Sequence, residues 1–264
     1  MNLERICEQA CRITQEVAQF LKAELGKVDI GQIEHKQRNH LVSYVDQTAE
    51  KMLVEALQKL VPEAAFLAEE ATVEYEEKEW QWIIDPLDGT TNFLHQLPFF
   101  SISIALQYQH KTVIGIVHEV NNNQTFWSYK GGAAYLNTQK IQVSATQTLE
   151  HSLLATGFPY YDFEQVDAYL QMLKPLILNT RGIRRMGSAA LDLAYVAAGR
   201  FDGYFEYSLS PWDVAAGAFL VEQAGGRVSD FGGGADYLHG KEIVAGNPAI
   251  FEYLVSDTQQ YFKK

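Results

Sequence analysis

The segment WQWIIDPLDGTTNF, residues 80–93, carries the densest group of side chains that could do chemistry. An apolar run leads directly into Asp85 and Asp88, which are separated only by Pro86 and Leu87. We expect a tight turn at the proline, which lets both carboxylates and the Leu87 carbonyl converge on one point at a strand end. Oxygen ligands of this kind suit a hard cation such as Mg²⁺.

Gly89 and Thr90 come next, where a helix could begin. Free N–H groups at a helix start bind anions, so a cation on one side and backbone amides on the other would form a cradle for phosphate. The alternative is an ordinary polar turn in which Asp and Thr cap a helix, and D-x-x-D-G alone does not separate the two interpretations. The complete fourteen-residue string is more specific.

Two other acidic segments stand at the ends of expected elements. Glu69 and Glu70 follow a short apolar run, where adjacent carboxylates usually mark a solvated loop. Asp213 opens an apolar helix, where it could simply complement the helix dipole. Together with Asp85 and Asp88, however, Glu69 and Asp213 supply the four carboxylates needed to hold two divalent ions.

The hydrophobic periodicity predicts the elements that must position these residues. Apolar spacings of three and four predict helices over 3–20, ending near Gly26, and over 46–60, closed by Pro62. Short β-rich runs predict strands at 80–84, 101–107, 112–119 and 125–130. Beyond residue 150 the two types alternate, with strands at 152–156, around 183, at 203–207 and near 228 and 243, and helices at 163–178, 188–199, 213–226 and 248–262.

The domain organisation follows from this order of elements. A boundary near residue 150 divides an N-terminal α+β half, residues 1–150, from a C-terminal α/β half, residues 151–264. The sequence contains no internal repeat, low-complexity tract or flexible tether. We therefore expect one rigid unit over residues 1–264.

Composition and charge exclude several classes of function. The chain has 264 residues, 47% of them hydrophobic and 20% charged, which is typical of a globular protein rather than a disordered one. Its formal net charge of −12 repels nucleic-acid phosphate and anionic lipid, so we expect neither as a partner. An anionic substrate then needs bound cations or a local basic patch.

The remaining polar groups favour ordinary structural roles. Cys7 and Cys11 would share one helix face and pack there. Without a signal-peptide core or an apolar membrane span, a reducing cytoplasm is the expected location. The histidines show no metal-ligand spacing such as H-x-x-x-H, so we expect surface or hydrogen-bonded positions for them.

The paired glutamates, DPLDGTTNF and WDVAAG, in this order, resemble the inositol monophosphatase family. The resemblance covers essentially the whole chain, from KQRNHLVSYVD (36–46) through GSAALDLAYVAAGRFDGYFE (187–206) to the last helix. It is highly specific for the metal-dependent, lithium-sensitive phosphatase superfamily and less specific for the substrate. It implies an α/β (α+β) layered sandwich of helix pairs and sheets (αβαβα), similar to fructose-bisphosphatase, with the active site where the halves meet.

The resemblance also implies a role for each matching residue. Glu69, Asp85 and the Leu87 carbonyl would hold a first Mg²⁺, and Asp85, Asp88 and Asp213 a second, in a site of two or three ions. Glu69 and Thr90 would orient and deprotonate the attacking water. The implied substrate contacts are Asp88, Gly89, Thr90, Gly187, Ser188, Ala189, Glu206 and Asp213, and the positions around the metal cluster and the N-terminal loop are Glu70, Asp46 and Lys36.

The chain departs from the family pattern at three positions. His40 stands where many relatives carry Asp, Ser43 replaces Thr, and Ala68 replaces a common Gly. All three lie beside the implied metal ligands rather than among them. They put the N-terminal loop and the third, weaker metal site in doubt, but not the core chemistry.

The implied reaction is hydrolysis of myo-inositol monophosphate by in-line attack of water, with lithium inhibition and a homodimer expected as family traits. Similar proteins act on fructose 1,6-bisphosphate, 3′-phosphoadenosine 5′-phosphate or histidinol phosphate. Glu206 favours a polyol, whereas Arg184 and Arg185 leave a pocket for a second phosphate open. An inactive regulatory protein is the alternative of another class, although all five of Glu69, Asp85, Asp88, Thr90 and Asp213 are present.

Overall fold

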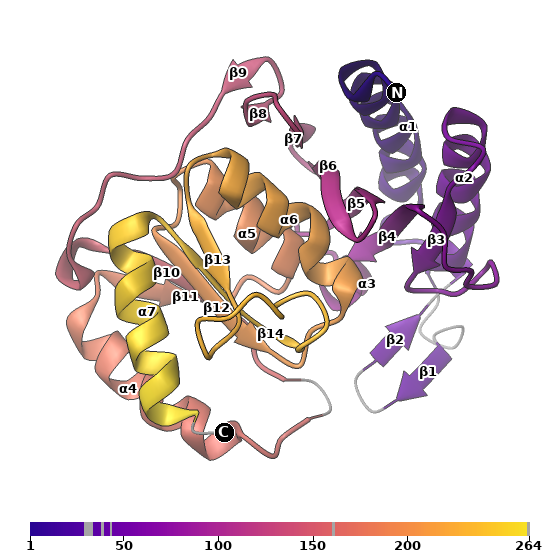
Figure 1. Cartoon of the computed structure of the whole chain (residues 1–264). Coiled ribbons are helices and arrows are strands. Elements are labelled where there is room, and N and C mark those ends of the chain that lie inside the picture. Colours follow the sequence, from indigo (N-terminus) through magenta and orange to yellow (C-terminus); the bar gives the residue numbers. More distant parts are fainter. Residues whose placement is uncertain (29–33, 38–39, 43, 160–161, 263–264) are drawn as a thin grey trace.

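The first elements of the chain are two helices with a small ribbon between them. The structure, a computed structural model, describes residues 1–28, 34–37, 40–42, 44–159 and 162–262, with the backbone alone described for 34–37 and 40–42. Helices α1 (Leu3–Glu24) and α2 (Tyr44–Leu60) flank the antiparallel pair β1 (Glu34–Gln37) and β2 (His40–Val42) in the sequence. The elements after α2 build two larger sheets, as Figure 1 shows.

The first large sheet has seven strands in the spatial order β3-β4-β5-β6-β7-β8-β9. Only the first pair is parallel, and the other neighbours are antiparallel. Its strands are β3 (Ala65–Ala68), β4 (Trp80–Asp88), β5 (Ser101–Tyr108), β6 (Lys111–Glu119), β7 (Gln124–Tyr129), β8 (Tyr135–Leu136) and β9 (Gln139–Lys140), and the short helix α3 (Thr90–Leu94) connects β4 to β5.

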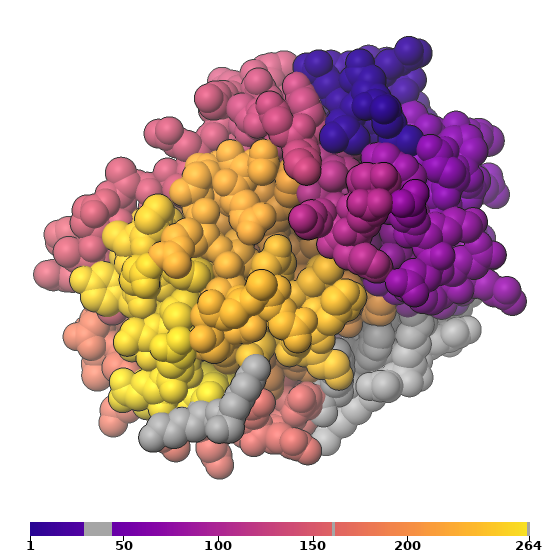
Figure 2. All heavy atoms as spheres, viewed as in Figure 1, coloured from indigo at the N-terminus to yellow at the C-terminus, as the bar shows by residue number. Residues whose placement is uncertain are grey.

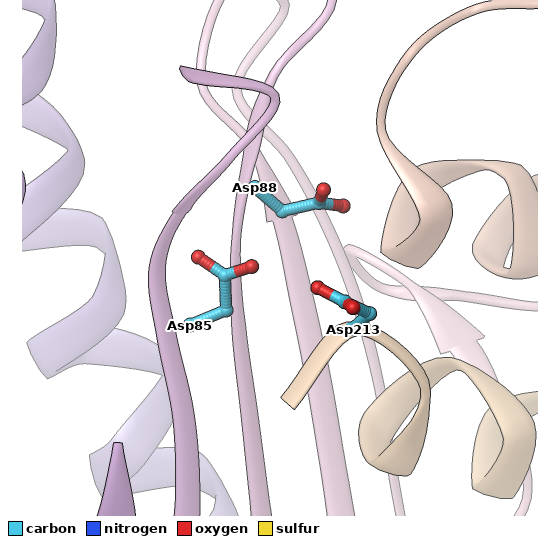
Figure 3. A group of neighbouring side chains, drawn as sticks. All are labelled: Asp85, Asp88 and Asp213. Atoms are coloured by element: carbon cyan, nitrogen blue, oxygen red, sulfur yellow. The ribbon is translucent and has the colours of Figure 1, made fainter. Parts of the chain in front are cut away.

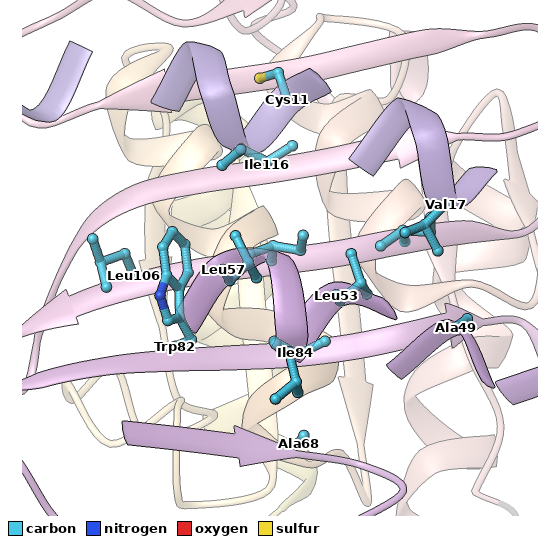
Figure 4. Packing of buried hydrophobic residues seen from close by; sticks show 14 of the residues in the cluster. Cys11, Val17, Ala49, Leu53, Leu57, Ala68, Trp82, Ile84, Leu106 and Ile116 are labelled. Carbon is cyan, nitrogen blue, oxygen red and sulfur yellow. The ribbon is translucent and has the colours of Figure 1, made fainter. Parts of the chain in front are cut away.

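Alternation along β4 divides its side chains between two cores. Trp82 and Ile84 are buried in the core that α1 and α2 form on one face of the sheet (Figure 4). Ile83 belongs to the core on the opposite face. Because successive side chains of a strand point to opposite faces, Asp85 is directed to the same face as Ile83.

The second sheet has five strands in the order β11-β10-β12-β14-β13. The first three strands are parallel, and the last two join antiparallel. The elements are a 3-10 turn (Leu149–His151), β10 (Leu153–Thr156), α4 (Val166–Asn179), β11 (Gly182–Arg184), α5 (Ala189–Ala197), β12 (Gly203–Tyr207), α6 (Pro211–Gln223), β13 (Arg227–Ser229), β14 (Glu242–Gly246) and α7 (Pro248–Tyr261).

Helices α5 and α6 form the central layer between the two sheets. Their apolar residues share one core with side chains of both sheets, for example Val117 on β6 and Ile243 on β14. Helices α4 and α7 cover the other face of the five-stranded sheet. Elements from the two ends of the chain occupy opposite sides of the molecule in Figure 2.

This arrangement confirms the predicted layered α/β sandwich, and most predicted elements lie within a few residues of the observed ones. Strands β1, β2, β3, β8 and β9 were not among the predicted elements. The predicted tight turn at Pro86 is wrong, because β4 continues through it to Asp88. The division near residue 150 stays a prediction. Within the described part of the chain, no helix has both the length and the apolar character needed to cross a membrane.

Candidate active site

A β-bulge at the end of β4 positions the first two carboxylates. Asp85 pairs with Ser103 and Asp88 with Ser101, so β4 carries one residue more than β5 over this interval. Residues three apart on a regular strand face opposite sides, and the extra residue brings Asp85 and Asp88 to the same side. A bulge also tolerates Pro86, since that position need not donate to the ladder. The Leu87 N–H instead donates to Asp85 Oδ1 at 2.9 Å.

Asp213 reaches the same point from the opposite layer. It lies in the first turn of α6, where its Oδ2 accepts the Ser210 N–H at 2.7 Å. The structure confirms that this carboxylate caps the helix, and the same carboxylate turns towards Asp85 and Asp88 (Figure 3). Its role as a metal ligand stays a prediction. One oxygen from each of the three carboxylates lies within 4.8 Å of the other two.

The electrostatics of this carboxylate cluster are unfavourable unless a cation is present. Burial raises the pKa of Asp85 and Asp213 well above the usual range, and the charges of neighbouring carboxylates raise both further. Burial also raises the pKa of Asp88 to about 6, against the lowering effect of its hydrogen bond from Ser188. The three carboxylates repel one another, and a bound cation would balance their charge. Oxygen ligands at this spacing suit a hard divalent cation.

The N-terminus of α5 holds Asp88 in place. Asp88 Oδ2 accepts the Ser188 hydroxyl at 2.6 Å and the Ala190 N–H at 2.7 Å. Ser188 is itself the N-cap of α5 and is buried. The structure thus places Ser188, a predicted substrate contact, against a predicted metal ligand, while Gly187 and Ala189 line the pocket beside it.

Thr90 and Gly89 close the cluster at the start of α3. The Thr90 hydroxyl lies 3.2 Å from Asp46 Oδ1 and 3.1 Å from the Leu87 carbonyl oxygen, and it can donate a hydrogen bond to either oxygen. Gly89 has a φ of 96°, and a side chain there would meet the Phe99 and Gly187 carbonyl oxygens at 3.1 and 3.2 Å. A glycine is therefore required where the chain turns from β4 into α3.

Glu69 follows β3 and lies near Asp85, whose pKa its charge raises. The residue that fixes this turn is Glu50 on α2, which sequence reasoning missed. Its two carboxylate oxygens accept the N–H groups of Glu70 and Thr72, both at 2.7 Å. The available signal was a charged residue one turn after Asp46, on the buried face of an amphipathic helix.

Glu206, on β12, also lines the pocket. It is buried, and its Oε2 accepts the Tyr204 hydroxyl at 2.5 Å. Burial raises the pKa of Glu206 to about 7, while the Tyr204 hydrogen bond and the Arg185 charge act to lower it. Arg185 lines the same pocket and lies 5.8 Å from the centre of the Phe158 ring.

One pocket brings most of the predicted site residues together. Glu69, Asp85, Leu87, Asp88, Gly89, Thr90, Gly187, Ser188, Ala189, Glu206 and Asp213 all line it. Asp46 contacts this set through Thr90. Glu70 does not line the pocket, and its N–H donates to Glu50 on α2. The side chains of Lys36 and His40 and all of Ser43 lie outside the described residues, and Ala68 ends β3 beside Glu69.

The sequence and the fold are both similar to those of known proteins. The chain is 40% identical over 257 residues to the Nus factor SuhB of Pseudomonas aeruginosa, which covers 96% of this chain and 95% of that protein. The structure of extragenic suppressor protein suhB from Bartonella henselae is similar with a TM-score of 0.90, at 39% identity over 98% of this chain and 99% of the other.

A second solved structure is similar to a slightly lower extent. The IMPase of Thermotoga maritima has a TM-score of 0.87 at 33% identity, over 96% of both chains. The sequence profile of the inositol monophosphatase family matches residues 2–263, which includes every acidic residue of the pocket. The chain therefore belongs to the inositol monophosphatase family.

Proposed function

We propose that this protein is a Mg²⁺-dependent phosphatase that hydrolyses a small phosphate monoester, with myo-inositol monophosphate as the leading substrate. The observation that carries the proposal is the convergence of Asp85, Asp88 and Asp213 within 4.8 Å in a pocket that Glu206 also lines. Such a pocket has one end suited to cations and phosphate and another suited to hydroxyl groups.

The acidic residues would hold two or three Mg²⁺ ions. Glu69, Asp85 and the Leu87 carbonyl form the first ligand set, and Asp85, Asp88 and Asp213 the second. When bound, such ions neutralise phosphate charge and promote both nucleophile formation and departure of the alkoxide. The ligands are preorganised, because Ser188 and Ala190 hold Asp88 and the helix start holds Asp213.

The protein's own groups would manage the attacking water. Glu69 borders the pocket and can accept a proton, and the Thr90 hydroxyl can orient the same water. The Thr90 hydroxyl also lies 3.2 Å from Asp46 Oδ1, so Asp46 could accept the proton that this hydroxyl releases. The amides of Gly89 and Thr90 would bind phosphate oxygens, and a water nucleophile requires no covalent phosphoenzyme.

The leaving group would lie towards Glu206. A buried carboxylate that faces a pocket binds hydroxyl groups well, since each O–H donates to a charged acceptor. Gly187 and Ala189 would complete this side with backbone contacts. These features support a polyol monophosphate, and we expect Li⁺ to inhibit the reaction as a trait of the family.

Arg185 favours a second candidate substrate. It lines the pocket, whereas Arg184 is exposed on the edge strand β11. A guanidinium in the pocket could bind a second phosphate, as fructose 1,6-bisphosphate or 3′-phosphoadenosine 5′-phosphate would require. Histidinol phosphate, which has no second phosphate, would gain nothing from this arginine.

A regulatory role without activity is the alternative of another class. The Pseudomonas aeruginosa relative carries the name Nus factor, and such a role needs none of the catalytic groups. The presence of all five catalytic and acidic residues supports an enzyme instead. The homodimer, a location in the cytoplasm and the absence of nucleic-acid binding stay predictions.

The test is phosphate release from inositol 1-phosphate, fructose 1,6-bisphosphate and 3′-phosphoadenosine 5′-phosphate, with and without Mg²⁺. The variant Asp88→Asn keeps an oxygen to accept from Ser188 and Ala190 but loses the charge, so it should fold and lose activity. Asp167→Asn, an exposed position on α4, is the matched control.

The three outcomes separate the candidates. Mg²⁺-dependent release that prefers the inositol ester and disappears in Asp88→Asn supports both mechanism and substrate. Preference for a bisphosphate keeps the mechanism and replaces the substrate. Release that is independent of Mg²⁺ or intact in Asp88→Asn contradicts the proposed mechanism.

A further inference from the structure

Gly157 lies beside Glu206 at the end of two adjacent parallel strands. Strand β10 pairs with β12 through Leu154 with Gly203 and Thr156 with Phe205, and the same register continued places Gly157 next to Glu206. Side chains at paired positions of a parallel sheet point to the same face. Both residues line the candidate active site.

The Glu206 carboxylate occupies the volume that a side chain at residue 157 would need. A Cβ atom there would meet the carboxyl carbon and both oxygens of Glu206 far inside 3.0 Å, a separation that real Cβ contacts essentially never show. The backbone at Gly157 does not have the positive φ that favours glycine. Glycine at residue 157 therefore leaves room for the neighbouring carboxylate, and the backbone conformation does not call for it.

Hydrogen bonds hold both partners of this contact. The Gly157 carbonyl oxygen accepts the Tyr169 hydroxyl of α4 at 2.8 Å, and the Thr156 hydroxyl donates to the Phe205 carbonyl at 2.7 Å. On the other side, the Tyr204 hydroxyl holds Glu206 Oε2 at 2.5 Å. The carboxylate is the far end of a side chain, so it is the group that must move if residue 157 gains a methyl group.

We propose that Gly157 is a specificity-determining residue, which seats the Glu206 carboxylate against the β10 backbone and so keeps the leaving-group end of the pocket shaped for a hydroxylated substrate. This inference rests on the proposed phosphatase function. Gly157 itself touches no reacting atom and acts by positioning Glu206. A methyl group at residue 157 displaces the carboxylate from the Tyr204 hydroxyl and from the place where substrate hydroxyls would meet it.

The test compares two esters that differ in the leaving group. Inositol 1-phosphate carries hydroxyl groups that can reach Glu206, and 4-nitrophenyl phosphate carries none. In Gly157→Ala we expect the ratio of kcat/KM for the inositol ester to that for the nitrophenyl ester to fall about tenfold, mainly through KM, as expected for the loss of one hydrogen bond to a charged group. Gly232→Ala, in the loop after β13 and outside the pocket, is the matched control.

A double-mutant cycle shows whether the effect passes through Glu206. In a Glu206→Ala background the change Gly157→Ala should leave the ratio unaltered, because the displaced group is absent. A further tenfold fall in that background, or an unchanged ratio in the single variant, overturns the proposal. If Gly157→Ala does not fold, Gly157→Ala/Glu206→Asp must fold, since the shorter side chain leaves room for the methyl group, and failure of this pair is also contradictory.

A crystal structure of Gly157→Ala separates this inference from the proposed function. We expect the Glu206 carboxylate to have left the Tyr204 hydroxyl, whatever the enzyme hydrolyses. A carboxylate still bound to Tyr204 overturns the inference even if inositol 1-phosphate is a good substrate. Conversely, a wild-type protein that hydrolyses neither of these esters nor the two bisphosphates overturns the proposed function, and the displaced carboxylate would still show that Gly157 positions Glu206.

Discussion

The buried carboxylates of this site depend on particular donors at the scale of single residues. Asp88 accepts hydrogen bonds from the Ser188 hydroxyl and the Ala190 N–H, and Asp213 accepts one from the Ser210 N–H. Glu50 accepts hydrogen bonds from the N–H groups of Glu70 and Thr72. A hydrogen bond to a charged group contributes more than one between neutral groups. Each carboxylate is thereby held in one orientation before any ligand arrives.

Glu50 offers the sharpest test of this support. Glutamine at residue 50 keeps one acceptor oxygen, but its NH₂ group would face a backbone N–H that now has no partner. We expect Glu50→Gln to lower the free energy of unfolding by about 1–3 kcal/mol, measured in urea, and kcat/KM by about tenfold or more through the displaced Glu69 turn.

The control for Glu50 lies on the same helix. Glu55 on α2 is exposed, so Glu55→Gln should change neither quantity appreciably. Equal effects of the two substitutions would mean that Glu50 acts only through its charge on the helix and not through the turn it binds.

Stability with Mg²⁺ and with EDTA tests the carboxylate cluster directly. Three carboxylates in one buried site repel one another, so Mg²⁺ should raise Tm by several degrees over the protein in EDTA, with stabilisation of about 2.7 kcal/mol at a hundredfold excess over Kd. Asp213→Asn keeps an oxygen for the Ser210 amide and removes one charge. In thermal unfolding scans it should be at least as stable as the wild type in EDTA and should gain much less from Mg²⁺, and an equal gain would contradict the ligand assignment.

At the scale of elements, the site depends on how closely α6 lies on the first sheet. Gly115 on β6 lies under that helix, and a Cβ atom there would approach the Ala216 carbonyl oxygen to 2.8 Å and Phe219 Cδ1 to 3.0 Å. The first of these atoms belongs to the helix backbone, which cannot move alone. The whole helix, and Asp213 with it, would have to rise from the sheet.

We therefore expect Gly115→Ala to weaken both folding and metal binding although residue 115 lies outside the pocket lining. Overpacking of a well-filled contact costs about 1–3 kcal/mol, measurable by urea denaturation. Displacement of Asp213 should raise the Mg²⁺ concentration at half-saturation severalfold, measured by calorimetric titration. A variant that loses stability but binds Mg²⁺ normally would show that α6 tilts about its N-terminus and leaves Asp213 in place.

Features that lie within one element could be predicted from the sequence, whereas features that depend on contacts between elements could not. Local patterns predicted α1, α2 and the strand that carries Asp85 and Asp88, because periodicity and acidic spacing are visible within one segment. The bulge was not predictable, since it is defined by the register between β4 and β5 rather than by Pro86 itself. The turn expected at Pro86 and the observed bulge nevertheless place the two carboxylates together.

Support from distant residues was hidden for a similar reason. Glu50 binds amides 20 and 22 positions away, and Gly157 faces Glu206 across a strand pair that comes together only in the folded sheet. Propensity identifies neither residue, because Glu is a common helix residue and Gly a common turn residue. The resemblance to a family predicted which carboxylates would bind metal, but it did not predict that Glu50 would hold the turn after Glu69.

At the scale of the whole molecule, the central helices connect two sheets, and each sheet contains a buried titratable residue. One is a histidine whose pKa is lowered by burial, and the other is a glutamate whose pKa is raised by burial. His118 on β6 is buried with its Nδ1 2.9 Å from the Thr125 hydroxyl, and burial lowers its pKa to about 4. Glu206 on β12 has a pKa raised to about 7, chiefly by burial. Because α5 and α6 pack on both sheets, we expect both groups to affect one cooperative unfolding transition.

The two groups should act on stability with opposite signs. Between about pH 4.5 and 7 the folded protein binds more protons at Glu206 than the unfolded chain, so this term falls as pH rises. Between about pH 4 and 6.5 the unfolded chain binds more protons at His118, so that term rises with pH. One pKa unit corresponds to about 1.4 kcal/mol, so each pKa difference of about 2.5 changes the free energy of unfolding by about 3.5 kcal/mol across its window. The two contributions largely cancel where the windows overlap, from about pH 4.5 to 6.5.

Single substitutions should reveal the separate contributions of Glu206 and His118 to the pH dependence of stability. Relative to wild type at each pH, Glu206→Gln should gain stability as pH rises from about 4.5 to 7, and His118→Gln should lose it from about 4 to 6.5. Urea denaturation at half-unit intervals of pH measures both differences, and taking differences removes the contribution of groups common to the two proteins. If both differences have the same sign of slope, one of the two side chains does not titrate as its burial requires, and if either is flat, that side chain is already solvated in the folded protein.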